Sequence, residues 1–107
     1  MYRKGQGVLQ NYKESVKWTR KAAEQGVPQA QYNLGLMYEK GQGVVQDYVM
    51  AHMFYNLAAV SGNKKAIENR DEIAERMTPS QITKAEEMAV EWERTNGKVD
   101  YTSGGET

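Results

Sequence analysis

An internal repeat with a period of 36 residues constrains the fold of this chain more than any other feature. Residues 2–26 align without a gap with residues 38–62, an offset of 36. The stretch Lys-Gly-Gln-Gly-Val occurs at 4–8 and again at 40–44, and both copies carry an Ala-Ala pair near their end. Self-similarity at such a period is typical of proteins in which short helical or strand units stack side by side. We therefore expect a stacked array.

The complete copy of the repeat predicts two helices joined by a glycine turn. Pro28 suits the first turn of a helix, where its missing N–H is not needed. Gly41-Gln42-Gly43 then ends the helix, because glycine adopts the left-handed conformation of a C-terminal cap, and Asp47 can cap the next helix. Between these signals apolar residues recur at helical spacing: Ala30, Leu34, Met37 and Tyr38, then Ala51, Phe54, Tyr55, Ala58 and Ala59. We predict helices near 28–40 and 47–61.

The earlier copy adds one helix. Asn11 is a candidate N-cap, and Glu14 stands three residues later, as in a capping box. We predict a helix near 11–25 that follows a glycine turn at 5–7. The first helix of this copy would lie before Tyr2, so we expect the chain to be the C-terminal part of a longer array.

These residues together resemble a known family. Ala30-Gln31-Tyr32-Asn33-Leu34-Gly35-Leu36-Met37-Tyr38, the Gly41–Val44 loop, Asp47-Tyr48 and the Ala58-Ala59 pair are similar to the Sel1-like repeat of bacterial-type arrays. That family is related to the tetratricopeptide repeat. The resemblance covers residues 2–62, and it implies an all-α fold in which antiparallel helices form a right-handed α–α superhelix.

The second half of the chain predicts a cap on the array. Asn63 is a candidate N-cap, but Arg70-Asp71 replaces the Leu34-Gly35 of the repeat, as expected of a terminal unit whose outer face meets water. Thr78, Pro79 and Gln81 then form the start signal of another helix. We predict helices near 63–77 and 79–95, five in all. Residues 1–95 would form the solenoid with its two-helix cap, and 96–107 a disordered tail.

Composition argues against several classes of function. The chain holds 14 basic and 14 acidic residues, so its formal net charge is zero, whereas a nucleic-acid-binding domain is normally basic. Cysteine is absent and His52 is the one histidine, so we expect no metal and no cofactor. No apolar stretch approaches the ~20 residues that span a bilayer, so we expect no membrane insertion.

Candidate catalytic groups are better explained as structure. His52 has no second histidine, and we expect it on the surface or partly packed. The carboxylates near Glu87 and Glu91 and those of 71–75 fit solvated helix faces. The glycines at 5–7 and 41–43 lack the strand and lysine of a phosphate-binding loop and fit helix turns. We therefore do not expect an enzyme.

The resemblance implies that the first helix of each pair lines the concave, ligand-binding side. We expect that side to bind a protein or peptide through Gln29, Tyr32, Asn33, Leu36, Lys40, Lys65, Glu68, Asn69 and Glu72. For Tyr32 and Leu36 packing against the adjacent repeat is an open alternative.

Two other hypotheses remain open. Some Sel1-like proteins have been proposed to be hydrolases, but those are rich in cysteine, which this chain lacks. A homodimer could form through the N-terminal helix, where Val16, Trp18 and Ala22 would be partly uncovered without a partner helix.

Overall fold

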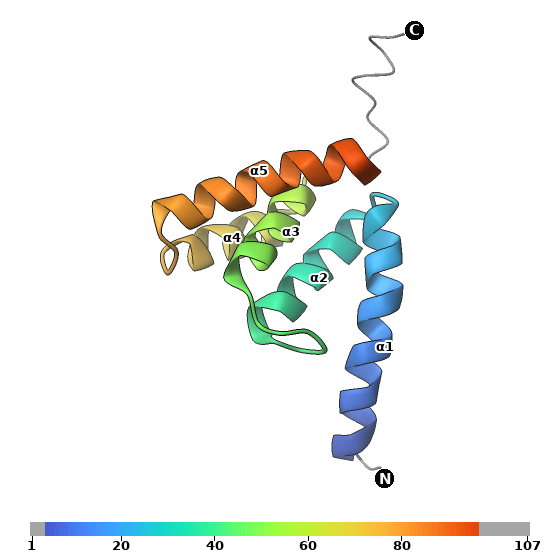
Figure 1. The fold of residues 1–107 in the computed structure, drawn as a ribbon. Helices are drawn as coiled ribbons and strands as arrows, with labels where there is room; N and C mark the ends of the chain where they lie inside the picture. The colour runs from blue at the N-terminus through green and yellow to red at the C-terminus, as the bar shows by residue number, and fades with distance from the viewer. Residues whose placement is uncertain (1–3, 97–107) are drawn as a thin grey trace, which may run out of the picture.

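Every regular element in the described part of the chain is a helix. The computed structural model describes residues 4–96, with side chains from Tyr12 onward, and within that range it contains no strand. Its helices are α1 (Lys4–Glu24), α2 (Pro28–Lys40), α3 (Tyr48–Val60), α4 (Lys64–Ala74) and α5 (Pro79–Asn96) (Figure 1). The all-α prediction is confirmed, and so are the last four predicted helices to within a few residues. The predicted tail lies outside the described residues, except for Asn96.

The prediction for the first helix is wrong at its N-terminus. α1 begins at Lys4 instead of residue 11, so Asn11 is not a cap and residues 5–7 belong to the helix. In the second copy the corresponding loop is held by α2: Asp47 N donates to the carbonyl of Tyr38 at 2.9 Å, and Gln46 Nε2 to that of Glu39 at 3.0 Å. The equivalents of these acceptors, residues 2 and 3, lie outside the described range. The loop at 41–43 therefore depends on bonds to another helix as well as on its glycines, whereas the turn at 5–7 was predicted from its glycines alone.

The other predicted caps are present. Asp47 accepts a hydrogen bond from Met50 N, and Asn63 accepts one from Ala66 N at 2.9 Å. Thr78 and Gln81 form a reciprocal capping box, with bonds of 2.9 and 3.1 Å between each backbone N–H and the other side chain. These bonds satisfy N–H groups that have no partner within the helix, so they set where α3, α4 and α5 begin.

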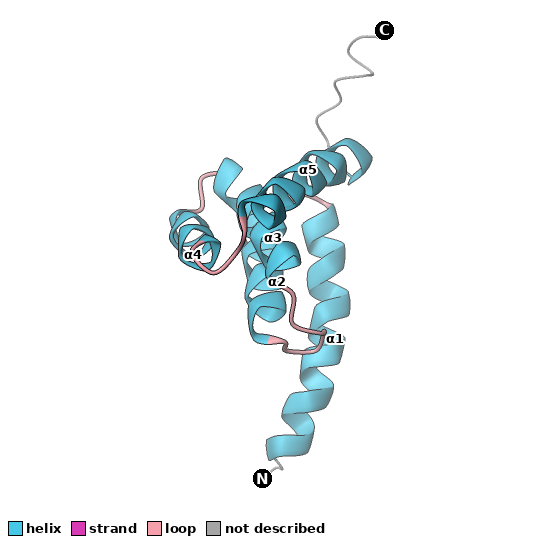
Figure 2. Ribbon diagram, turned by 60° about the vertical axis from the view of Figure 1, so that its left-hand side comes forward, coloured by secondary structure: helices cyan, strands magenta, loops and turns pink. Residues whose placement is uncertain are grey.

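Helix α3 is the centre of the molecule. It packs against α2, α4 and α5, while α1 packs against α2 (Figure 2). One core cluster joins α1, α2, α3 and α5 around Leu34 and Phe54, and another joins α3, α4 and α5 around Tyr55 and Ile73. Because α3 belongs to both clusters, its buried residues extend well beyond the predicted stripe and include His52, Met53 and Leu57.

The last helix crosses over α3 (Figure 1). Trp92 meets the ring of Phe54 edge to face, with centroids 5.0 Å apart, while Tyr38 from α2 stacks on Phe54 at 5.8 Å. Edge-to-face and stacked pairs add to the hydrophobic gain from burying the rings. Phe54 is thereby fully buried between α2 and α5.

The glycine loop between α2 and α3 also holds α1. A Cβ atom on Gly43 would lie 2.7 Å from the carbonyl oxygen of Tyr12 and 2.9 Å from Cγ2 of Val16, both in α1. Gly43 also has a φ of +81°, which side chains rarely adopt. Gly41 in the same loop has a φ of +70°, but its Cβ would meet only Gln46 at 3.3 Å. The second glycine therefore serves packing between repeats as well as the turn.

We expect Gly43→Ala to lower the free energy of unfolding by more than Gly41→Ala does. Both substitutions strain the backbone, and only the first also forces α1 away, which should cost about 1–3 kcal/mol more. Urea unfolding followed by circular dichroism measures both. Equal losses would mean that α1 does not depend on this contact.

Candidate protein-binding surface

The predicted binding residues lie on α2 and α4, the first helices of successive repeat units. On α2, Gln29 and Lys40 are exposed, whereas Tyr32, Asn33 and Leu36 are half-buried. Of the predicted residues on α4, Asn69 is half-buried and the charged ones are exposed: Lys65, Glu68 and Glu72. The two helices therefore present a polar surface with half-buried side chains among exposed charges.

A hydrogen-bond network links α2, α3 and α4 beneath this surface. Asn69 Nδ2 donates to the hydroxyl oxygens of Tyr32 and Tyr55, each at 3.4 Å. Tyr55 in turn donates to Glu39 Oε1 at 2.5 Å. Burial first, and then the bond to Glu39, raise the pKa of Tyr55 above its ordinary value, so its hydroxyl keeps its proton at neutral pH. The network fixes Asn69 relative to α2.

Tyr32 and Leu36 have mainly a packing role. Both lie against the core cluster of α3 and α4, and the ring of Tyr32 lies 5.8 Å from that of Tyr55. The packing alternative for these residues therefore agrees with the structure. A Cβ on Gly35 would come within 2.5 Å of the Tyr55 ring, so glycine is needed there for α2 and α3 to approach.

Asn33 is held more loosely. Its Oδ1 accepts a hydrogen bond from Gln29 Nε2, one helical turn earlier, at 3.1 Å. Asn33 and Asn69 occupy equivalent positions of the repeat, since their numbers differ by the 36-residue period. The structure thus places an asparagine at the same site on both first helices.

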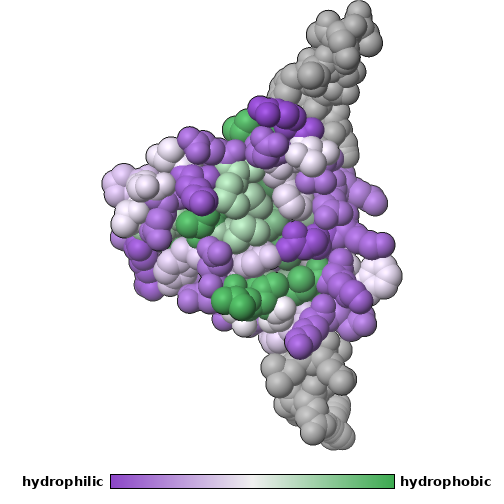
Figure 3. All heavy atoms as spheres, viewed as in Figure 1, coloured by the Kyte–Doolittle hydropathy of each residue, from purple (hydrophilic) through white to green (hydrophobic). Residues whose placement is uncertain are grey.

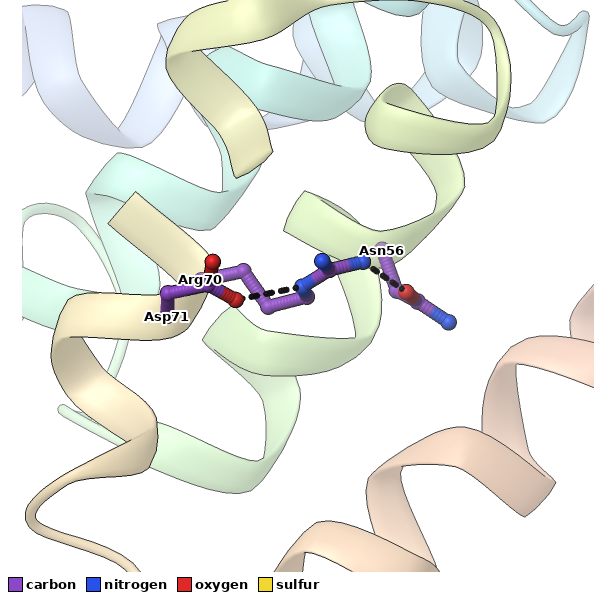
Figure 4. Close-up of polar contacts among 3 residues, drawn as sticks. All are labelled: Asn56, Arg70 and Asp71. Atoms are coloured by element: carbon purple, nitrogen blue, oxygen red, sulfur yellow. Dashed lines mark hydrogen bonds and ion pairs between the residues drawn. The ribbon is translucent and has the colours of Figure 1, made fainter. Parts of the chain in front are cut away.

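The departure of α4 from the repeat is accommodated by polar contacts. Arg70 stands where the repeat has the fully buried Leu34. Its guanidinium reaches to α3, where Nη1 donates to Asn56 Oδ1 at 2.8 Å, while Nε pairs with Asp71 at 3.3 Å (Figure 4). Both contacts let the charge stay partly solvated, so α4 keeps its place on α3 without an apolar residue at this position.

His52 is not at the surface, contrary to expectation. It lies on α3 with only 3% of its area exposed, and its Nδ1 has no hydrogen-bond partner. Burial, and then the positive charge of Arg70, lower its pKa below the ordinary 6.5, while Glu86 and Asp71 oppose this shift. His52 is thus a core residue of α3.

The described residues contain no group of three or more histidine, aspartate or glutamate side chains that could hold a metal ion. Of the carboxylates singled out above, Glu87, Glu91, Asp71 and Glu72 are exposed. Between residues 4 and 96 no helix has the length and hydropathy to cross a membrane.

Sequence reasoning missed one apolar surface. Apolar residues gather over α3, framed by hydrophilic ones (Figure 3). Between α3 and α5 lies a hollow of about 330 Å³, lined by Met50, Met53, Met88, Glu91, Trp92, Thr95 and Asn96. The sequence feature that could have indicated it is the apolar character of α3 on all of its faces, which is typical of a helix that other elements cover on several sides.

The face of α1 that was predicted to be partly uncovered is so in the structure. Val16 and Ala22 are half-buried against the core, and Trp18 is 65% exposed. Lys21 lies over the indole at 5.7 Å, within a shallow hollow of about 470 Å³ on this helix.

The helices of this chain stack in pairs, and the first helix of each pair, α2 or α4, has an exposed face. This arrangement is that of a helical-repeat protein. Comparison with known families makes this specific, because the Sel1 repeat matches residues 1–27 and 28–63. The chain therefore belongs to the Sel1 repeat family. Sel1 repeats generally mediate protein–protein interactions, and proteins built from them are typically scaffolds without enzymatic activity.

A solved structure agrees with this assignment. The chain is similar to c5321, a protective antigen of uropathogenic Escherichia coli with an SLR fold, at 33% sequence identity and a TM-score of 0.76. The similarity covers 80% of this chain but only 19% of that chain. Among curated proteins, no sequence matches this one.

We expect His52 to make stability depend on pH. Because the pKa is lowered in the folded state, the unfolded chain binds a proton first as the pH falls below about 6.5, and the free energy of unfolding decreases from there. His52→Leu removes this dependence, so the stability of the variant relative to the parent should rise as the pH falls. Urea unfolding at several pH values measures it, and parallel pH profiles would contradict it.

Proposed function

We propose that this chain binds a protein or peptide segment across the surface formed by α2 and α4. Membership of the Sel1 repeat family supports protein binding in general. The surface itself is favoured by one observation: the paired asparagines Asn33 and Asn69, at equivalent positions of α2 and α4, of which Asn69 is fixed through Tyr32 and Tyr55. A prearranged polar group loses little conformational freedom on binding.

The charges around the asparagines favour a partner of mixed charge. Lys40 and Lys65 carry positive charge, Glu68 and Glu72 carry negative charge, and all are exposed. No single sign dominates, so the surface should attract neither a highly acidic nor a highly basic ligand over long range. These side chains would select among partners by short-range pairing.

A random peptide library displayed on phage, selected against the whole chain, tests the proposal. In NMR spectra of the chain, the tightest peptide should shift the side-chain amide signals of Gln29, Asn33 and Asn69. The double variant Lys65→Glu, Glu72→Lys should weaken binding about tenfold, because rearranged charges at a contact turn attraction into repulsion.

The matched control places the same two charge changes on α5, as Lys84→Glu with Glu87→Lys, both exposed, and should leave the affinity unchanged. Selection of no peptide, or shifts confined to Trp18 or to the methionines of α3 and α5, would contradict the proposed surface.

Self-association through α1 is a second candidate, favoured by the exposure of Trp18. Large exposed aromatic residues are frequent centres of protein interfaces. The flanking Lys17 and Lys21 are exposed as well, so a second copy would have to bury or displace charged groups around the indole.

If α1 mediates self-association, sedimentation should give an average mass that rises with concentration, and Trp18→Gln should restore the monomer mass. Val90→Gln on α5 is the control, because Val90 is similarly exposed, at 58%. Neither substitution should change the free energy of unfolding by more than about 0.5 kcal/mol. A monomer at every concentration would exclude this candidate.

A further inference from the structure

We propose that Asn33 and Asn69 hold the main chain of an extended peptide, Asn33 by donating to a peptide carbonyl and Asn69 by accepting from a peptide N–H. This inference rests on the proposed function and specifies how its surface recognises a partner. The argument comes from which half of each side-chain amide is already used within the fold.

Asn69 has its donor half occupied. Both of its bonds run from Nδ2, to the hydroxyl oxygens of Tyr32 and Tyr55 at 3.4 Å. Within residues 4–96 its Oδ1 accepts no hydrogen bond and is not enclosed. A carboxamide oxygen has two lone pairs, so Asn69 offers an acceptor whose direction is set by two tyrosines from neighbouring helices.

Asn33 has the opposite half occupied. Its Oδ1 accepts from Gln29 Nε2 at 3.1 Å, and its Nδ2 donates to no group in the described part of the chain. Gln29 is exposed while Asn33 is half-buried, so the bond orients the Asn33 amide with its NH₂ group available. The two asparagines thus present a donor on α2 and an acceptor on α4.

A peptide backbone offers the complementary pair at every residue. A peptide backbone that passes both asparagines can therefore accept a hydrogen bond from Asn33 with one of its carbonyls and donate one to Asn69 with one of its N–H groups. Because main-chain groups are common to all sequences, this pair would hold many peptides, and the surrounding charges of Lys65 and Glu72 would select among them.

The same substitution at the two positions tests the assignment. Asn33→Asp keeps the oxygen that Gln29 needs but removes the free donor, so affinity for the selected peptide should fall about three- to tenfold, as for the loss of a hydrogen bond. Asn69→Asp keeps an acceptor, and the hydroxyl of Tyr32 can turn to donate to its second oxygen, so the affinity should fall less than with Asn33→Asp. Asn69→Ala removes the acceptor and should weaken binding about three- to tenfold. Both aspartates add one negative charge, which makes each a control for the other.

A second measurement uses the peptide as the probe. Replacing one backbone amide at a time by an ester removes a single N–H; one such ester should weaken binding to the parent but not weaken it further in Asn69→Ala. The inference would be overturned if Asn33→Asp and Asn69→Asp weakened binding equally. It would also be overturned if every ester in the peptide weakened binding to Asn69→Ala as much as it weakens binding to the parent. If the inference fails but the bound peptide still shifts NMR signals of α2 and α4, the proposed function stands. If those signals do not shift, the proposed function fails together with the inference.

Discussion

The burial of α3 on nearly all sides is the constraint on which the rest of the structure depends. Tyr55, Phe54 and Ala58 are fully enclosed, and each helix packed against α3 covers a different part of it. Tyr38 and Trp92 meet the same ring, that of Phe54, from opposite helices. Burial of large aromatic side chains is among the strongest contributions to stability in a small domain, so Phe54 helps to hold both α2 and α5 in place.

Two copies of one repeat reach different environments in this chain. Trp18 and Phe54 occupy equivalent positions, yet Trp18 is 65% exposed and Phe54 is fully buried. The positions of α3 that face α5 are apolar, Met53 and Leu57, while their equivalents on α1 are Lys17 and Lys21. The sequence of each copy therefore matches its position in the array: α3 is suited to cover by another helix on its outer side, and α1 is suited to solvent.

Local signals predicted most of the fold because they depend on neighbouring residues only. Asp47, Asn63 and the Thr78–Gln81 pair cap helices through bonds within three residues of themselves, and such bonds can be inferred from sequence. The start of α1 was predicted wrongly because the turn at 5–7 was inferred by analogy with 41–43, which is held by contacts to another helix. The burial of His52 was missed for a related reason, since it depends on how α4 and α5 pack around α3.

The candidate site was likewise predictable only in part. Its residues were inferred from the resemblance to the Sel1-like repeat, and the 36-residue period gives Asn33 and Asn69 equivalent positions. The distinction between them was not predictable, because the Asn33 amide is held by Gln29 on its own helix, whereas the Asn69 amide is held by Tyr32 on α2 and Tyr55 on α3.

Tyr55 connects this surface to the core. Its ring is fully buried against Gly35, and its hydroxyl bonds both Glu39 and Asn69. A change that loosens the packing of α2 on α3 would therefore also free the Asn69 amide to rotate, and the acceptor would lose its fixed direction. Groups that are held before binding contribute more to affinity than groups that must be ordered by it. In the proposed mode of binding, the close packing permitted by Gly35 thus affects recognition through Tyr55, although Gly35 itself is buried.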